Sequence, residues 1–409
     1  MPGPILDDSF PVEVRRHVAA LTAARLTANA CYRFGPPFLA VIARGLHVTL
    51  GELGVALAIS EIAGLTSPLI GHAVDRVHRR TAMAGGLAGV AVGAAVAASA
   101  GGRPQFAIGL VVLAQSKVVF DLALAAWVAD HVEPARRGRV IGITETSWAL
   151  GLLVGVTSLG LLAAVTSWRA GYAGGALAVL VMAVATWARL RDDPLDDGHH
   201  APDPDAPERD APAVPALTTI AGPARSHPIW PFVAGAAALM AASQCLFVTF
   251  GSWLKDQFGF GAARLSAATF LLGGVELVAS VTAARRTDAW GAERSAIGGA
   301  LVMVPAMLLL ALIHTVLVPG LALLAIALVG FEFAIVSALP IGTRLVPGAP
   351  ARGLGLMIGA GTAGRAVMSV TASRLYGDGH LAPPMLLGAG AAALCAAAIT
   401  YGHRRTLTA

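Results

Sequence analysis

Nine ionisable side chains lie deep inside long apolar stretches of this 409-residue sequence. An ionisable group at the depth of a lipid bilayer is costly, and it usually pairs with an opposite charge or transfers protons. Acids and bases that exchange partners or protons could carry out the chemistry of moving a solute. The nine are Arg25, Arg33, Glu61, Lys117, Asp121, Glu145, Glu276, Glu332 and Arg365.

In the first half of the chain the spacing of these groups predicts a network. Arg25 and Arg33 are eight residues apart, and Lys117 and Asp121 are four apart, so each pair lies on one face of a helix. This half holds three positive and three negative groups, a balance that lets each charge find a partner. We expect an Arg25–Asp121–Glu145 network, with Lys117 and Arg33 nearer the middle of the membrane. It either fixes helix packing or changes partners during a functional cycle.

In the second half two acids, Glu276 and Glu332, accompany one base, Arg365. The unmatched acid would be expensive in its ionised form, so we expect it to hold a proton. Glu332 is the first candidate for a proton carrier and Glu276 the second. The alternative is a neutral carboxyl group that is only hydrogen-bonded. All nine groups except Glu61 are therefore candidates for proton coupling or for an intramembrane charge network.

The elements that must position these groups are membrane-spanning helices. The chain is 56% hydrophobic and 13% charged, with a mean hydropathy of +0.71, whereas soluble domains are about one quarter charged. A helix needs about 20 apolar residues to cross a bilayer. We therefore predict an all-α membrane protein with twelve spans at 18–43, 51–73, 81–101, 104–130, 139–164, 168–188, 229–252, 264–286, 292–313, 317–341, 353–374 and 383–402.

The loops predict the orientation and the partners. Arginine-rich loops follow the second, fourth, eighth and tenth runs, so that side is expected to face the cytoplasm together with both termini. Topology thus explains the net charge of +5, and no nucleic acid is expected. The three cysteines lie in apolar runs far apart, and we expect neither metal nor cofactor. The predicted location is the plasma membrane, with the chain in the lipid bilayer as a monomer.

An acidic, proline-rich stretch divides the chain. Residues 1–188 and 228–409 are predicted to be two six-helix bundles joined by a flexible cytoplasmic linker at 189–227. An internal repeat supports the division. The loop around Asp75 recurs around Asp288, an offset of 213 residues (288 − 75), and the loop around Arg137 recurs around Arg352, an offset of 215 residues (352 − 137). The second offset places Glu332 opposite Lys117 (332 − 215 = 117). Parallel repeats with a site between them are a transporter arrangement.

One loop motif resembles a known family. The stretch from Gly71 to Arg80, Gly-His-Ala-Val-Asp-Arg-Val-His-Arg-Arg, is similar to the helix 2–3 signature of the major facilitator superfamily, with His78 where that family usually has glycine. The resemblance implies two pseudo-symmetric six-helix bundles around a central cavity. It also implies that Asp75 caps a neighbouring helix and that arginines latch the two halves; otherwise the motif is only a basic cytoplasmic loop. The implied gating residues are Gly71, Asp75, Arg76, Arg79 and Arg80.

Further residues resemble bacterial efflux permeases related to the drug:proton antiporters. These are Arg25, Asn29 and Arg33, then Lys117 with Asp121, Glu145 to Trp148, and Phe331 to Phe333. The antiporters have a Gly-Pro pair in the fifth helix, whereas here Val156 follows Gly155. The resemblance implies a secondary transporter that exports a small organic molecule by alternating access, coupled to protons. The alternatives are an uptake symporter or uniporter, and a sensor or scaffold without transport.

Uncharged residues complete the set of candidates. Asn29, Gln115 and Gln244 could hydrogen-bond a substrate or join helices. Trp148 and Phe247 could line a cavity. No phosphate-binding loop, zinc-type spacing or nucleophile elbow is present, so we do not expect an enzyme.

Overall fold

The computed structural model describes most of the chain. Described are residues 6–7, 10–66, 70, 73–74, 76–190, 229–346, 350–377 and 379–408. The linker predicted at 189–227 falls almost wholly outside these ranges, so its flexibility and the domain boundaries remain predictions. Gly71 and Asp75 also lie outside the described residues.

The first bundle contains six spans, two of which are interrupted. The first span is α1 (Val12–Phe34), a 3₁₀ turn η1 (Pro36–Phe38) and α2 (Leu39–Leu46), where one helix at 18–43 was expected. Pro36 and Pro37 explain the break, because proline cannot donate the backbone hydrogen bond that a continuing helix needs. The other elements of this bundle are α3 (Leu50–Ala63), η2 (Gly64–Thr66), α5 (Arg79–Ala98), α6 (Arg103–His131), α7 (Pro134–Leu150), η3 (Gly151–Val156), α8 (Thr157–Val165) and α9 (Trp168–Arg189).

The second bundle is more regular and runs from α10 to α15. Every span in it is a single helix, although α12 and α13 each contain one internal proline. Its helices are α10 (Ile229–Phe258), α11 (Ala262–Trp290), α12 (Ala292–Ile313), α13 (Leu317–Arg344), α14 (Pro350–Leu375) and α15 (Ala382–Thr408).

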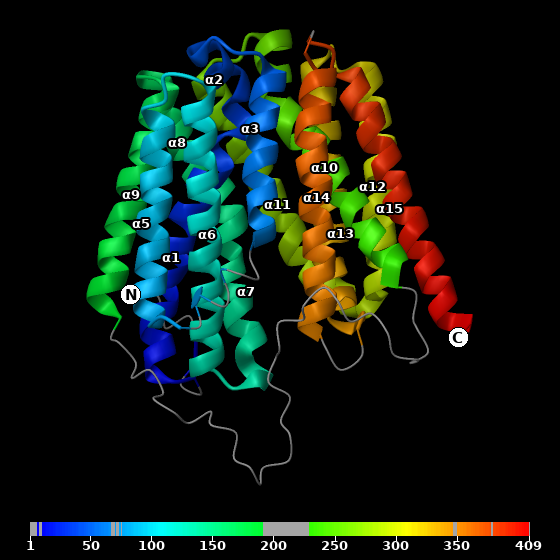
Figure 1. Ribbon diagram of the computed structural model, residues 1–409. Coiled ribbons are helices and arrows are strands. Elements are labelled where there is room, and N and C mark those ends of the chain that lie inside the picture. Colours follow the sequence, from blue (N-terminus) through cyan, green and yellow to red (C-terminus); the bar gives the residue numbers. More distant parts are fainter. Residues whose placement is uncertain are drawn as a thin grey trace.

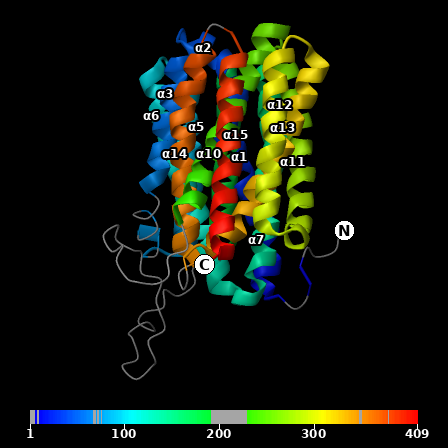
Figure 2. The same ribbon diagram turned by 90° about the vertical axis from the view of Figure 1, so that its right-hand side faces the viewer.

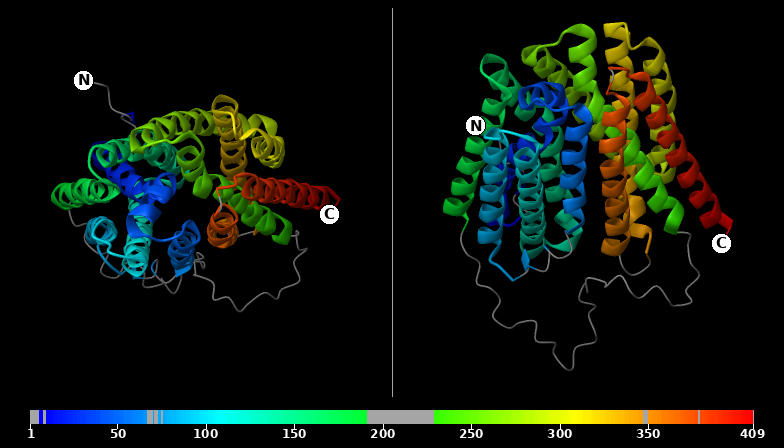
Figure 3. Two further views of the ribbon diagram at one scale, coloured as in Figure 1. Left: turned by 90° about the horizontal axis from the view of Figure 1, so that it is seen from above. Right: turned by 45° about the horizontal axis from the view of Figure 1, so that its top comes forward.

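The two bundles stand side by side, α1–α9 on one side and α10–α15 on the other (Figure 1). Ten helices of the described part are long and apolar enough to cross a membrane by themselves. The first span, interrupted and charged, and the second, described in pieces, complete the twelve. The view turned by 90° shows the long helices nearly parallel (Figure 2), and the view from above separates the two groups (Figure 3).

The molecule has two ends that differ in how closely the bundles approach. We call the end where α1 passes through η1 into α2 the α2 end (upper in Figure 1), and the opposite end, where α9 ends and α10 begins, the linker end. At the α2 end a Cβ added to Gly251 of α10 would lie 2.0 Å from the carbonyl oxygen of Pro37. A Cβ on Gly54 of α3 would lie 2.4 Å from the carbonyl oxygen of Ser369. Glycine lets the backbones of the two bundles touch there.

At the linker end the described ion pairs join helices of the same bundle. Arg79 pairs with Asp130 at 2.8 Å in the first bundle, and Arg344 pairs with Glu293 at 3.3 Å in the second. The close backbone contacts between the bundles described above therefore lie at the α2 end, whereas these ion pairs at the linker end stay within one bundle.

Candidate functional site

The intramembrane charges of the first bundle form a connected cluster around Arg25. Its Nε lies 3.0 Å from Asp121 Oδ1, and its Nη1 lies 2.8 Å from Glu145 Oε1. Lys117 Nζ is 2.5 Å from Asp121 Oδ2. The same Nη1 of Arg25 also donates to the carbonyl oxygen of Thr144 at 3.1 Å. The structure thus brings together Arg25, Asp121 and Glu145, with Lys117 one helical turn away on α6.

Arg33 pairs with the other bundle. Its Nη1 and Nη2 donate to the two carboxylate oxygens of Glu276, each at 2.7 Å, and Nη1 also donates to the carbonyl oxygen of Trp148 at 2.8 Å. The side chains of Arg33 and Glu276 are 8% and 0% exposed. A bidentate, buried pair of this kind is among the strongest ionic contacts in proteins. It joins α1 to α11 across the interface between the bundles.

A second pair crosses the same interface. Arg365 of α14 donates to Glu61 Oε1 of α3, and its Nη2 also donates to the hydroxyl oxygen of Tyr32 at 2.7 Å. The Tyr32 hydroxyl in turn donates to Glu61 Oε1 at 3.1 Å. The expectation that the first bundle balances its own charges was therefore wrong, because sequence spacing shows which charges share a helix face but not which bundles meet.

Glu332 is the acid that remains without a basic partner among the described contacts. It is 3% exposed on α13, and Ser280 Oγ donates to its Oε2 at 2.5 Å. Ser280 lies one turn beyond Glu276 on α11, so Glu276 and the serine that binds Glu332 share one face of that helix. Glu332 interacts electrostatically with both Glu276 and Arg33. An unpaired carboxyl group thus lies beside the ion pair that joins the bundles.

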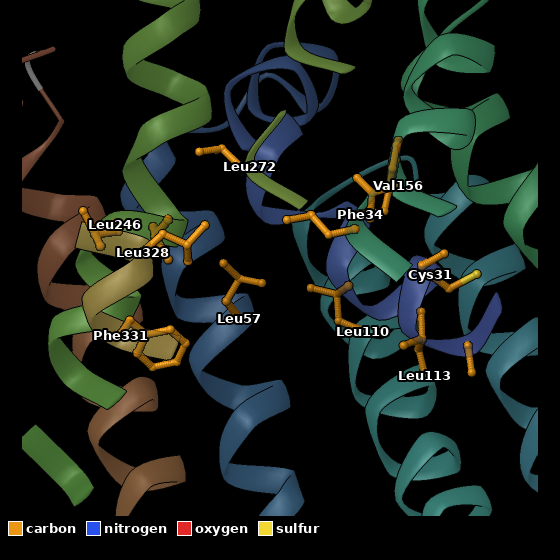
Figure 4. Packing of buried hydrophobic residues seen from close by; sticks show 14 of the residues in the cluster. Cys31, Phe34, Leu57, Leu110, Leu113, Val156, Leu246, Leu272, Leu328 and Phe331 are labelled. Carbon is orange, nitrogen blue, oxygen red and sulfur yellow. The ribbon is translucent and has the colours of Figure 1, made fainter. Parts of the chain in front are cut away.

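A cavity lies between the bundles next to these pairs. It has a volume of about 90 Å³, and Arg33, Glu61 and Arg365 contribute its charges. Leucines from both bundles and Phe331 border this space (Figure 4). Its remaining lining is mainly apolar and includes Tyr32, Trp148, Met240, Gln244, Leu246, Phe247, Leu272 and Leu328.

Aromatic rings surround the cationic groups of the cavity. The Arg33 guanidinium lies 4.5 Å from the ring centroid of Trp148 and 5.9 Å from that of Phe247. The Arg365 guanidinium lies 5.9 Å from the ring centroid of Tyr32. Such cation–π contacts hold a positive charge in a low-dielectric setting. They also place Trp148 and Phe247 in the cavity wall.

The predicted amides have different surroundings. Gln244 lines the cavity, and its Nε2 donates to Ser369 Oγ at 2.7 Å. Asn29 donates to Ser147 Oγ at 3.2 Å in a fully buried position. Thr66 Oγ1 donates to the amide oxygen of Gln115 at 3.0 Å. All three amides therefore join helices, and of the three only Gln244 belongs to the described cavity lining.

The described arginines of the predicted gating motif contact their own bundle. Arg79 donates to Asp130 on α6 and to the carbonyl oxygen of Val74. Arg80 donates to the carbonyl oxygen of Trp187 on α9 at 2.8 Å and stacks over its ring at 4.0 Å. Arg76 is exposed. The predicted latch between the halves depends partly on Asp75, outside the described residues, and remains a prediction.

Sequence reasoning missed three features of the site. Tyr32 bridges Arg365 and Glu61, but one tyrosine in an apolar helix carries no distinguishing signal. Ser280, the hydrogen-bond partner of Glu332, is likewise inconspicuous. Residues Gly151–Val156 form a π-helical segment, η3, which packs on α1 through Gly151 and Gly155. π-Helical segments often occur at functional sites.

Comparisons with known proteins agree with this architecture. A family model described as the Major Facilitator Superfamily matches residues 21–373. A comparison with curated protein sequences found no significant match.

Solved structures extend the comparison to nearly the whole chain. The inward-facing, unoccupied structure of a bacterial homolog to the human lysosomal transporter Spinster has a TM-score of 0.76 at 14% identity, covering 97% of this chain and 98% of that one. Its occupied, inward-facing form has a TM-score of 0.77 at 13% identity, covering 96% and 97%. The human organic anion transporter MFSD10 (TETRAN) has a TM-score of 0.67 at 20% identity, covering 95% and 100%. The chain belongs to the Major Facilitator Superfamily.

Proposed function

We propose that this membrane transporter exports a small organic molecule in exchange for protons, with Glu332 as the proton-carrying group. One observation carries the proposal: a buried carboxyl group without a basic partner lies beside the Arg33–Glu276 pair that holds the bundles together. The family consists of transporters rather than enzymes. The proposed setting is the plasma membrane, with the linker end in the cytoplasm.

Alternating access requires the bundles to part at the α2 end and approach at the linker end. Parting separates Arg33 from Glu276 and Arg365 from Glu61, and each group left behind would be a buried charge without a partner. A carboxylate that loses its cation in a poorly solvated site becomes neutral by binding a proton. Glu276 and Glu332, on facing helices, can share that proton, and re-pairing of Arg33 with Glu276 would expel it on the other side.

The cavity walls favour an apolar substrate with a hydrogen-bond acceptor. Aliphatic and aromatic side chains provide most of the surface. Arg365 contributes to the lining, and its buried Nε has no hydrogen-bond partner among the described residues. Because an arginine N–H is only a donor, a substrate with an acceptor atom would satisfy it.

The proposal is tested with everted membrane vesicles that hold a pH gradient. A resistance screen of an overexpressing strain first selects compounds from a panel of aromatic organic cations, anions and neutral molecules. Adding a selected compound should dissipate the gradient in parental vesicles. Glu332→Gln keeps the shape of the side chain and fixes it in a neutral form. This variant should still exchange the compound across the membrane, but adding the compound should move no protons. Ser280→Ala is the control, because it removes the hydrogen bond and keeps the carboxyl group.

Two results would reject parts of the proposal. Proton movement by Glu332→Gln at the parental rate would remove Glu332 as the carrier, and Glu276, Asp121 and Glu145 would be examined next. Accumulation of the compound in right-side-out vesicles, driven by an inward proton gradient, would instead identify an uptake symporter. Loss of transport with retained binding of a partner protein would identify a sensor.

A further inference from the structure

A groove on the outer face of the second bundle lies away from the central cavity. It has a volume of about 580 Å³ and runs between α12 and α13, close to the end of α11. The backbones of α12 and α13 form its floor, where Gly299 packs against Gly330. A Cβ added to Gly299 would lie 2.4 Å from the carbonyl oxygen of Gly330. Val302, Val329 and Phe333 line its apolar part, and Trp290, Arg294, Ser295 and Gly298 complete it.

The groove has an apolar part and a basic mouth. Trp290 stacks on Phe333 with ring centroids 6.0 Å apart and is 51% exposed. The Arg286 guanidinium lies 5.9 Å from the Trp290 ring centroid. Arg294 is exposed and makes no ion pair or hydrogen bond with the described residues. Tryptophan and arginine at a helix end are typical of the level of lipid headgroups.

One buried polar group in the groove lacks a partner. Ser295 is 5% exposed, and its buried Oγ has no hydrogen-bond partner among the described residues. Serine hydroxyls in membrane helices usually donate to a carbonyl oxygen one turn earlier, as Thr287 does to Ala283 at 2.7 Å. Ser295 is the fourth residue of α12 and follows Arg294 directly, so its unsatisfied hydroxyl lies close to the headgroup level, where a lipid oxygen can accept from it.

We propose that this groove binds an anionic phospholipid, with an acyl chain along Gly298, Val302 and Val329 and the phosphate at Arg294 and Arg286. The ester or phosphate oxygens would accept from Ser295. Gly298 makes room for the chain, since a Cβ there would meet no protein atom within 4 Å. Basic pockets between membrane helices on the cytoplasmic side are known to hold anionic headgroups, and this groove lies at the linker end.

The first bundle provides a matched control position. Gly85 of α5 is equivalent to Gly298 by the repeat offset (298 − 85 = 213), and a Cβ there also meets nothing within 4 Å. The residue equivalent to Arg294 is Thr81 (294 − 213 = 81), and the two arginines that precede it contact their own bundle, Arg79 through Asp130 and Arg80 through the carbonyl oxygen of Trp187. A leucine at Gly85 therefore adds the same bulk on a membrane helix without touching the proposed site.

The test uses the full chain in phosphatidylcholine nanodiscs with increasing amounts of phosphatidylglycerol whose acyl chains carry bromine, a quencher of tryptophan fluorescence. The signal of Trp290, one of seven tryptophans, is obtained by subtracting the same protein with Trp290→Phe. Brominated phosphatidylglycerol should half-quench it at a mole fraction about thirtyfold lower than brominated phosphatidylcholine, because two arginines at roughly 1 kcal/mol each near an anionic surface give about 2 kcal/mol.

The variants decide between a site and ordinary boundary lipid. Arg294→Gln should raise the half-quenching mole fraction of phosphatidylglycerol about fivefold, which leaves only the contribution of Arg286. Gly298→Leu should reduce quenching by both lipids, whereas Gly85→Leu should leave both curves unchanged. Identical curves for the two lipids in the parent protein, or an unaltered curve in Arg294→Gln, would overturn the proposal. Because Arg294 is exposed and unpaired, its replacement tests the site without disturbing the packing.

Discussion

The two bundles repeat one architecture but compensate their intramembrane charges differently. In the first bundle Asp121 has two basic partners, Arg25 and Lys117, within its own bundle. Among the described residues of the second bundle, Glu276 and Arg365 pair with side chains of the first bundle, and Glu332 accepts a hydrogen bond from Ser280. The first cluster therefore survives any rigid-body movement of the bundles, whereas the second set of contacts exists only while they meet at the α2 end.

This difference separates a structural role from a switching role. A group that keeps its partners in every conformation stabilises the bundle but does not sense its movement. A group that loses its partner when the bundles part changes its charge state or its contacts, and so couples movement to protons or solute. The residues most sensitive to the transport cycle should then be those whose partners lie across the interface, which are Arg33 and Glu61 of the first bundle and Glu276 and Arg365 of the second.

The largest expected effect follows from removing one partner of the pair between the bundles. Arg33→Ala leaves Glu276 buried without a cation, which costs about 3–5 kcal/mol in comparable buried pairs. We expect a large fall in thermal stability in detergent and loss of transport. Arg25→Ala is the matched control on the same helix, and its effect should be smaller because Asp121 keeps Lys117. Equal losses in the two variants would contradict the distinction between ion pairs within a bundle and ion pairs across the interface.

A smaller effect is expected from adding a methyl group where the bundles touch. In Gly251→Ala the new Cβ would meet the backbone of Pro37, and overpacking of this kind costs about 1–3 kcal/mol. The variant should open the α2 end. Cysteines replacing Arg44 and Asp256, whose side chains pair across that end at 3.0 Å, would report closure by cross-linking with a short bifunctional thiol reagent, because the three native cysteines are buried.

The cross-linking yield should fall in Gly251→Ala and stay at the parental level in Gly390→Ala, where a Cβ meets nothing within 4 Å. An undiminished yield in Gly251→Ala would show that the close approach at Pro37 does not control this end.

The smallest effect is expected at the outer edge of the first cluster. The Glu145 side chain is 53% exposed, and exposed ion pairs contribute about 0–1 kcal/mol. Glu145→Gln should therefore change thermal stability little, while Asp121→Asn should lower it more because Lys117 and Arg25 both lose a carboxylate. A greater loss in Glu145→Gln would mean that the cluster depends on its exposed member.

Much of the architecture was predictable from local features. Apolar runs of about 20 residues and the 213-residue offset predicted twelve spans in two bundles, because helices in lipid must satisfy their own backbone and repeats fold alike. The spacing of Lys117 and Asp121 predicted their contact, since residues four apart share a helix face. The break at Pro36 and Pro37 was missed within an otherwise apolar run.

The sequence by itself determined which ionisable groups enter the membrane, which of them share a helix face and that one acid must remain unmatched. Only the tertiary structure decided that Arg33 pairs with Glu276, that Arg365 pairs with Glu61, and that Glu332 is the acid left with a serine. The physical reason is that helix periodicity acts over a few residues. Pairing across 243 or 304 residues depends on how glycine contacts such as Gly251 with Pro37 set the distance between the bundles.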